Sequence, residues 1–137
     1  MTGCGQILDA DLIATPRLGV INFHPSDLRA GHGAGAQPYQ DLLDRGDPWT
    51  RWTLHHMVPQ VDAGPIIGQS CSIHAGDALG RVTRTPDALF TRMATLLPAL
   101  VDILLQAVLE QDAPVGPVDF VAALPPDLIR QMQRPLA

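Results

Sequence analysis

The sequence contains few cysteines and no long uninterrupted apolar run. Two cysteines, Cys4 and Cys71, are too few in 137 residues for the disulfide framework of a small secreted domain, and no basic start followed by an apolar stretch indicates a signal peptide. The longest apolar region, residues 96–109, is interrupted by Pro98 and Asp102 and falls short of the roughly 20 residues that a membrane-spanning helix needs. These absences predict a cytoplasmic protein without a membrane segment.

Positive charge is also scarce. The chain has 9 Lys and Arg residues against 14 Asp and Glu, a formal net charge of -5, and no run of basic residues. Binding along a nucleic-acid backbone needs clustered Lys and Arg side chains that displace counterions from the phosphates. A nucleic-acid partner is therefore not expected.

The sequence has 46% apolar and 17% charged residues, a composition typical of a chain that forms one globular core. We expect one domain, or part of one, over residues 1–111. Five prolines then follow within 26 residues. They predict an irregular, Pro-rich tail over residues 112–137, with one short helix at residues 127–133.

Short apolar segments alternate with helical patterns, which indicates an α/β fold. Strands are predicted at residues 18–23, 52–58 and 65–73. The first of them is continuously apolar, which is typical of a strand covered on both faces. Helices are predicted at residues 9–14, 38–45 and 86–108. In the last helix apolar residues recur at three- and four-residue steps, and Pro98 predicts a kink at residues 94–98.

Three polar side chains stand where predicted strands end. Asn22 and His24 are two residues apart and therefore point to the same side of a strand, whereas Phe23 points to the other. Asp62 lies in a turn at residues 59–64, between two further strands. An acyl or formyl transfer needs donors for the carbonyl oxygen as it becomes negative, and a base for the attacking amine or water. Asn22 and His24 suit the first role, and Asp62 suits the second.

Other interpretations stay open for each residue. Asn22 and Asp62 are also common turn residues, and His24 can equally be a half-buried structural histidine. The glycines at residues 31–35 raise the possibility of a phosphate cradle, but no Gly-Lys-Ser/Thr ending follows them. No histidine pair has the helical spacing of a zinc site, so no metal is expected.

The order of these motifs resembles that of the 10-formyltetrahydrofolate-dependent formyltransferases. The matching segments are residues 3–8, 22–28, 53–55 and 61–67, together with Gly33. The resemblance covers roughly residues 3–73 and implies a Rossmann-like α/β domain of which only the C-terminal half is present. We therefore expect a sheet of about three strands with flanking helices, lacking the N-terminal strands.

The resemblance also implies roles for individual residues. Asn22 and His24 would stabilise the developing oxyanion, and Asp62 would organise proton transfer between the attacking amine and the folate nitrogen. The donor, 10-formyltetrahydrofolate, would be held by backbone and side chains near the same site. These donor-binding residues are Gln6, Ile7, Leu8, His55, Val58 and Gln60. A small-molecule amine is the implied acceptor.

Two departures from the family pattern affect which of the family's properties can be expected of this chain. The family commonly reads Ser-Leu-Leu-Pro after the histidine, whereas this chain reads Ser-Asp-Leu-Arg over residues 26–29. The family domain also begins with a nucleotide-fold half that is expected to be missing before Met1. The remaining sheet would then expose an edge, so a homodimer or a separately encoded N-terminal half is the expected partner.

Three functions are compatible with these patterns. The first is formyl transfer to an amine, and the second is hydrolysis of formyltetrahydrofolate, with water in place of the amine. The third is a non-catalytic remnant or binding module that keeps the three polar residues but has lost its acceptor site.

Overall fold

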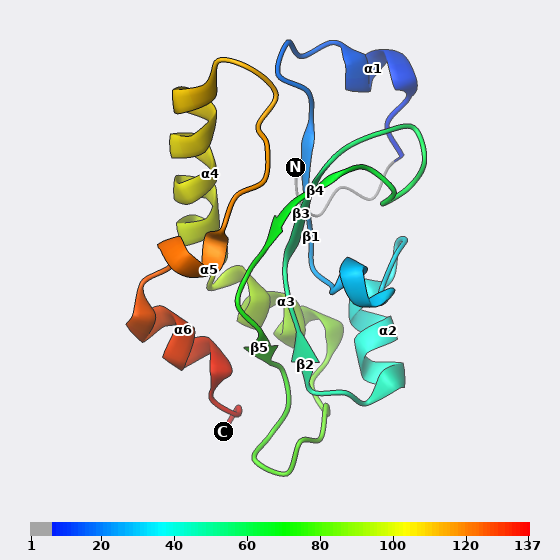
Figure 1. The fold of residues 1–137 in the computed structure, drawn as a ribbon. Coiled ribbons are helices and arrows are strands. Elements are labelled where there is room, and N and C mark those ends of the chain that lie inside the picture. The colour runs from blue at the N-terminus through cyan, green and yellow to red at the C-terminus, as the bar shows by residue number, and fades with distance from the viewer. Residues whose placement is uncertain (1–6) are drawn as a thin grey trace.

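The computed structural model of the protein describes residues 7–137. Its helices are α1 (Ala10–Ala14), the 3-10 turn η1 (Leu28–Ala30), α2 (Pro38–Arg45), α3 (Pro86–Ala94), α4 (Leu97–Gln111), α5 (Phe120–Ala123) and α6 (Pro126–Gln133). Its strands are β1 (Ile21–His24), β2 (Trp49–Thr50), β3 (Thr53–His56), β4 (Ile66–Gln69) and β5 (Ile73–His74). The fold is α/β, a small antiparallel sheet with flanking helices, which confirms the predicted class (Figure 1).

The main sheet has the strand order β1-β3-β4, and all its neighbours are antiparallel. Asn22 lies opposite His55, and His24 lies opposite Thr53, which in turn lies opposite Gln69. Because side chains alternate between the two faces of a strand, these five polar residues share one face of the sheet. The candidate site therefore lies on this polar face.

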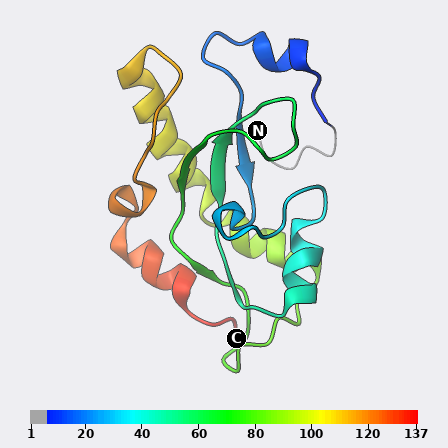
Figure 2. The same cartoon turned by 45° about the vertical axis from the view of Figure 1, so that its right-hand side comes forward.

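The other face of the sheet packs on the helices. Phe23 and Leu54 are buried in the main hydrophobic core together with Met93 of α3 and Leu100 of α4. Trp52 is completely buried, and its indole Nε1 donates a hydrogen bond to the Met93 carbonyl at 2.8 Å. Figures 1 and 2 both show α4 running beside the sheet.

The helix predicted at residues 86–108 is two helices, α3 and α4, with a bend of 47° between them. The break lies within the predicted kink at residues 94–98, which is confirmed. Pro98 occupies the first turn of α4, where no backbone N–H is required. Within residues 7–137, no single helix is long and apolar enough to cross a membrane, and α3 and α4 reach that length only as a bent pair.

Two predicted strands differ in extent from those observed. The segment 65–73 is divided, because β4 ends before Ser70 and the chain then turns to pair β5 with β2. The Ser70 hydroxyl accepts a hydrogen bond from the Trp52 N–H at 3.0 Å, so this backbone donor has a partner where the strand is interrupted. The strand predicted at residues 18–23 begins later in the structure, at the first residue of β1, Ile21. Gly19 has a φ of 82° and interrupts the extended backbone before it.

The segment after α4 is more regular than its prolines predict. The helix predicted at residues 127–133 is α6, which is confirmed, but α5 was not expected. Pro125 and Pro126 occupy the N-cap and first turn of α6, positions that tolerate a missing N–H. The prolines therefore begin this helix instead of preventing it.

This C-terminal segment packs against the same core as the sheet. Phe120, Leu124 and Met132 belong to the main hydrophobic cluster. The Val118 N–H donates a hydrogen bond to the Ile67 carbonyl of β4 at 2.8 Å. The segment thus covers the outer edge of β4 at that point.

Candidate active site

The structure brings Asn22, His24 and Asp62 together and adds His55 to them. Asn22 and His24 project from β1 and His55 from β3, while the loop after β3 carries Asp62. Asp62 Oδ1 lies 3.4 Å from His24 Nδ1 and 3.6 Å from His55 Nε2. Asn22 Nδ2 lies 3.3 Å from the same His55 nitrogen. The predicted trio is therefore a four-residue cluster with the Asp62 carboxylate between two imidazoles.

Each histidine of the cluster has one ring nitrogen held by a backbone carbonyl. His24 Nε2 lies 2.6 Å from the Gly33 oxygen, and His55 Nδ1 lies 3.0 Å from the His56 oxygen. A carbonyl oxygen only accepts hydrogen bonds, so these two nitrogens carry the hydrogens of the neutral rings. The remaining nitrogens, His24 Nδ1 and His55 Nε2, are the ones that face Asp62.

The three side chains face one another where little water reaches them. The side chains of His24, His55 and Asp62 are 7%, 3% and 7% exposed. The Asn22 amide donates to His55 Nε2, so this nitrogen acts as an acceptor. His24 Nδ1 and Asp62 Oδ1 are therefore the pair between which a proton can pass.

The turn that carries Asp62 is strained and closely packed. Asp62 has a φ of 51°, in the left-handed region that side chains rarely adopt. Gly64 has no room for a side chain, because a Cβ there would lie 1.6 Å from the His56 carbonyl oxygen. Strain of this kind persists only where the surroundings hold the residue, and it is concentrated at functional sites. The turn therefore fixes the carboxylate against the two rings.

The glycine-rich loop supports the cluster directly. Gly33 supplies the carbonyl that holds His24, and the Gly35 N–H donates a hydrogen bond to Asp62 Oδ2 at 2.7 Å. Gly33 has a φ of 63°, and a Cβ on it would lie 2.6 Å from the Ser26 Cβ. Only glycine fits that position. This supporting role was not predicted from the sequence. The spacing of the glycines at residues 31–35 was the pattern that could have indicated it.

Of the residues predicted to hold the donor, His55 is a member of this cluster. Gln6 is outside the described residues. The loop between β3 and β4, which carries Val58 and Gln60, lies beside the segment that enters α1, which carries Ile7, in both ribbon views (Figures 1 and 2). Ile7 is 76% exposed and Val61 of the loop is 53% exposed. Exposed apolar side chains beside a buried polar cluster fit a flat, largely apolar ligand.

Other chemistries find less support in the structure. Cys71 is buried, and burial raises the pKa of its thiol, which keeps it in the poorly nucleophilic protonated form. Among residues 7–137, no group of three or more His, Cys, Asp and Glu side chains has a geometry that could hold a metal ion. The acid–base cluster remains the best candidate site.

Comparison with known proteins identifies relatives among the formyltransferases. A methionyl-tRNA formyltransferase of Thermotoga maritima is 44% identical over 62 residues, which are 45% of this chain and 19% of that protein. A methionyl-tRNA formyltransferase of Staphylococcus aureus (strain JH1) is 42% identical over 77 residues, which are 56% of this chain and 24% of that protein. The chain therefore spans about a quarter or less of the length of these relatives.

Solved structures with the same fold have low sequence identity. The phosphoribosylglycinamide formyltransferase of Bacillus halodurans matches with a TM-score of 0.63 and 22% identity, over 80% of this chain and 53% of that one. The glycinamide ribonucleotide transformylase 1 of Symbiobacterium toebii matches with a TM-score of 0.64 and 20% identity, over 83% of this chain and 52% of that one. A family model described as formyl transferase matches residues 1–89, more than half of the sequence. This chain therefore belongs to the formyl transferase family.

Proposed function

We propose that this chain carries the catalytic centre for transfer of a formyl group from 10-formyltetrahydrofolate to an amine. The observation that supports it best is the Asp62 carboxylate, which lies 3.4 Å from His24 and 3.6 Å from His55. Buried acid–base groups beside hydrogen-bond donors are what addition of an amine to a carbonyl requires. Membership of the formyl transferase family adds support.

The roles of the four residues follow from their hydrogen bonds. Asn22 uses one amide hydrogen on His55, so its second hydrogen is the donor for the formyl oxygen as negative charge develops. His24 Nδ1, in a long contact of 3.4 Å with Asp62, receives a proton through that carboxylate during the reaction and then donates to the same oxygen. Contacts of this length in a ligand-free site commonly tighten when the substrate binds.

Proton transfer is assigned to the pair of His24 and Asp62. As the amine nitrogen bonds to the formyl carbon, it loses a proton to the Asp62 carboxylate. When the bond from that carbon to the folate nitrogen breaks, the nitrogen takes a proton back from the pair. The site therefore ends the reaction with the same number of protons as it began with.

The proposed acceptor is a small-molecule amine. The relatives and solved structures carry methionyl-tRNA and phosphoribosylglycinamide in their names. A transfer RNA is the less suitable acceptor for this chain, because the chain has a net charge of -5 and its 9 basic residues are scattered.

The cytoplasm, where folate donors would meet a small-molecule amine, remains the predicted location.

A partner for the chain is also proposed. The chain covers 53% of a solved relative with the same fold. A second copy, or a separately encoded N-terminal half, would supply surfaces that the remaining part of that relative contributes. Analytical ultracentrifugation of the chain alone should show a dimer, or an aggregating species that a co-expressed half rescues. A stable folded monomer would argue against this partner.

The activity is tested by Asp62→Asn, which keeps the shape of the side chain but removes its basicity. We expect formyl transfer to fall by about 10²- to 10⁴-fold. Binding of 10-formyltetrahydrofolate, measured by calorimetry, should persist. The assay supplies this donor with glycinamide ribonucleotide, with methionyl-tRNA or with no amine, and it follows formylated product and formate. Asp44→Asn, an exposed helical residue bonded to Gln40, is the matched control.

Three results would contradict the proposal in different ways. Unchanged transfer in Asp62→Asn would remove the assigned base. Formate release without any amine would identify hydrolysis as the reaction. Tight folate binding without either product would favour a binding module.

A further inference from the structure

One loop holds both proton-transfer residues of the site. Gly33 accepts a hydrogen bond from His24 at 2.6 Å, and Gly35 donates one to Asp62 at 2.7 Å. These two contacts come from glycines separated by a single residue, so a displacement of the loop shifts both partners together. The geometry of the His24–Asp62 pair therefore depends on whatever fixes the loop over residues 25–35.

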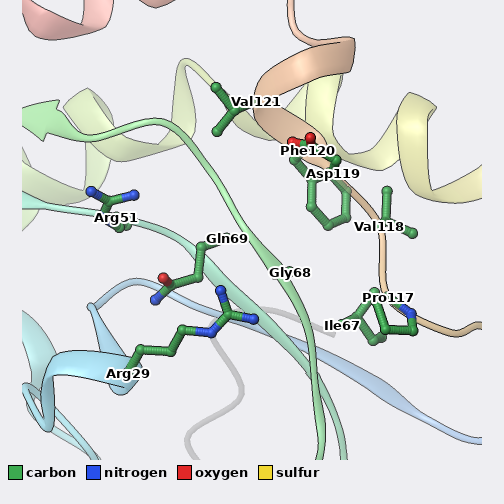
Figure 3. A pocket seen from close by; sticks show the side chains of 10 residues that line it. All are labelled: Arg29, Arg51, Ile67, Gly68, Gln69, Pro117, Val118, Asp119, Phe120 and Val121. Atoms are coloured by element: carbon green, nitrogen blue, oxygen red, sulfur yellow. The ribbon is translucent and has the colours of Figure 1, made fainter.

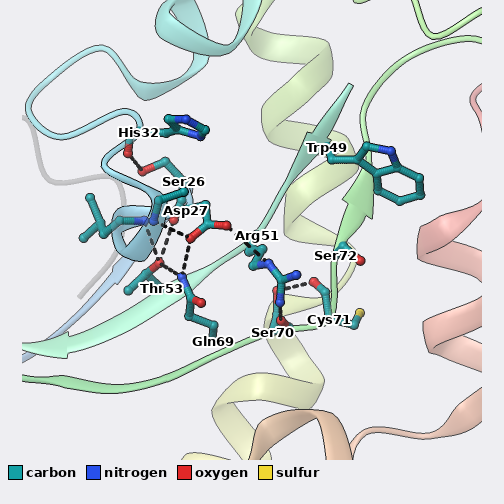
Figure 4. Close-up of polar contacts among 12 residues, drawn as sticks. Ser26, Asp27, His32, Trp49, Arg51, Thr53, Gln69, Ser70, Cys71 and Ser72 are labelled. Carbon is teal, nitrogen blue, oxygen red and sulfur yellow. Dashed lines mark hydrogen bonds and ion pairs between the residues drawn. The ribbon is translucent and has the colours of Figure 1, made fainter. Parts of the chain in front are cut away.

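Asp27 lies at the base of this loop and joins it to the neighbouring strands (Figure 4). Its Oδ1 accepts hydrogen bonds from Gln69 Nε2 at 2.8 Å and from the Ala30 N–H at 3.2 Å. Its Oδ2 lies 3.4 Å from Arg51 Nε. Its carbonyl accepts a hydrogen bond from the His32 N–H at 3.1 Å. One aspartate thus closes the loop on itself and ties it to β4.

Thr53 and Ser26 make the second attachment. The completely buried Thr53 donates from Oγ1 to the Ser26 carbonyl at 2.7 Å and accepts from Gln69 Nε2 at 3.0 Å. The Ser26 hydroxyl donates to the His32 carbonyl at 2.8 Å, next to Gly33. Thr53 also lies directly opposite His24 in the sheet. A continuous set of hydrogen bonds therefore connects Asp27 and Gln69 to the loop that orients His24.

This network occupies the positions at which the chain departs from the family pattern. Asp27 and Arg29 stand where the resembling family commonly has a leucine and a proline. An apolar pair would hold the loop by packing, whereas Asp27 holds it by a charge and several hydrogen bonds. On its solvent side the network borders a groove of about 430 Å³, which Arg29, Arg51 and Gln69 help to line (Figure 3).

We propose that Asp27 is a positioning residue that acts through Gln69, Thr53 and the glycine loop to set the tautomer and orientation of His24. It does not contact the reacting atoms. Its kinetic consequence rests on the proposed formyl transfer, but the effect on the His24 ring rests on the hydrogen bonds alone. The two parts can therefore be tested separately.

The test compares Asp27→Leu, which introduces the family's residue, with Asp27→Asn in the full chain. Two-dimensional 15N NMR of the histidine rings should show one defined state for His24 in the parent, with hydrogen on Nε2. Asp27→Leu should convert this to a mixture of tautomers, and Asp27→Asn should retain most of the parent signal, because its amide oxygen still accepts from Gln69. In Asp27→Leu, kcat should fall by up to about 100-fold, as expected for a small displacement of a catalytic group.

The KM for the donor should stay within about threefold of the parent value, since the donor-binding residues are not part of the network. Asp119→Leu is the matched control: Asp119 also caps a single helical turn, by accepting from the Ala122 N–H at 3.1 Å, and it lines the same groove, but it takes no part in the hydrogen bonds described above for the network. It should change neither the His24 signals nor kcat. Gln69→Leu, whose side chain borders the groove, provides a second break in the network if Asp27→Leu fails to fold.

The outcomes separate this inference from the proposed function. Unchanged His24 signals and kcat in folded Asp27→Leu and Gln69→Leu would overturn the positioning role. Equal losses in Asp27→Leu and Asp119→Leu would show a general effect on stability and would also overturn it. Altered His24 signals in a chain without any formyl transfer would support the positioning role and reject the function.

Discussion

His24 and Asp62 form the proton-transfer pair of the proposed reaction because each of their neighbours has a fixed hydrogen-bonding role. Two backbone carbonyls set the tautomers of His24 and His55, and the Asn22 amide occupies His55 Nε2. His55 therefore orients Asn22 and contacts the carboxylate, while His24 Nδ1 remains for exchange of a proton with Asp62. At the residue scale, identical side-chain types in one cluster have different functions because their partners differ.

Asn22 is the residue whose loss should affect the reacting oxygen most directly. In Asn22→Ala we expect kcat/KM for formyl transfer to fall by about 10²- to 10³-fold, the usual effect of removing one donor to a developing negative oxygen. Affinity for 10-formyltetrahydrofolate should change little. Gln106→Ala, which removes an exposed amide that donates to Asp102 on α4, is the control and should leave the rate unchanged. A rate within a few-fold of the parent in Asn22→Ala would mean that another donor contacts the oxygen.

At the element scale, the loop between β3 and β4 is determined by one close approach. Gly64 lies so near the end of β3 that the turn can form only because this residue has no side chain. The turn holds Asp62 in its left-handed conformation. The carbonyl that Gly64 approaches is the one that accepts the His55 Nδ1 hydrogen bond. The same backbone contact therefore influences both the carboxylate and the imidazole.

Gly64→Ala should lower the free energy of unfolding by at least about 2 kcal/mol, because its new methyl group overlaps the His56 carbonyl and the backbone has to move. It should also lower formyl transfer, since the His56 carbonyl and Asp62 move with it. Urea denaturation and the transfer assay measure the two effects. Gly116→Ala is the control, because a Cβ at Gly116 meets nothing within 4 Å. Equal stability of the two variants would show that the turn relaxes freely.

At the scale of the whole molecule, the C-terminal segment completes the core beneath the sheet. Its approach to β4 depends on Gly68, where a Cβ would lie 2.4 Å from the Val118 carbonyl oxygen and 2.7 Å from the Phe120 ring. Phe120 is completely buried in the same cluster as Phe23 of β1. The tail predicted for residues 112–137 thus contributes apolar packing to the unit that carries the site.

Phe120→Ala should cost about 3–5 kcal/mol of unfolding free energy, the usual range for removing a buried aromatic ring. Unfolding followed by circular dichroism and by tryptophan fluorescence should remain one cooperative transition in the parent chain. The control is Val121→Ala, whose side chain is 44% exposed and should cost far less. Two separate transitions in the parent would instead support a boundary between residues 111 and 112.

The sequence by itself determined the chemical character of the protein and most of its elements. The placement of Asn22 and His24 on one side of a strand, the turn with Asp62 and the kink in the long apolar helix were all predictable, because each depends on spacing within a few residues. The family resemblance followed from the order of the same motifs. These features are local, and local patterns are what a single sequence displays.

Only the tertiary structure decided how that chemistry is held. The contact between Gly35 and Asp62 joins residues 27 positions apart, and that between Asp27 and Gln69 joins residues 42 positions apart. No periodicity relates such pairs, because they meet only after the strands have paired in one register and the glycine loop has closed. The tautomers of His24 and His55 depend on backbone carbonyls that the fold brings to them.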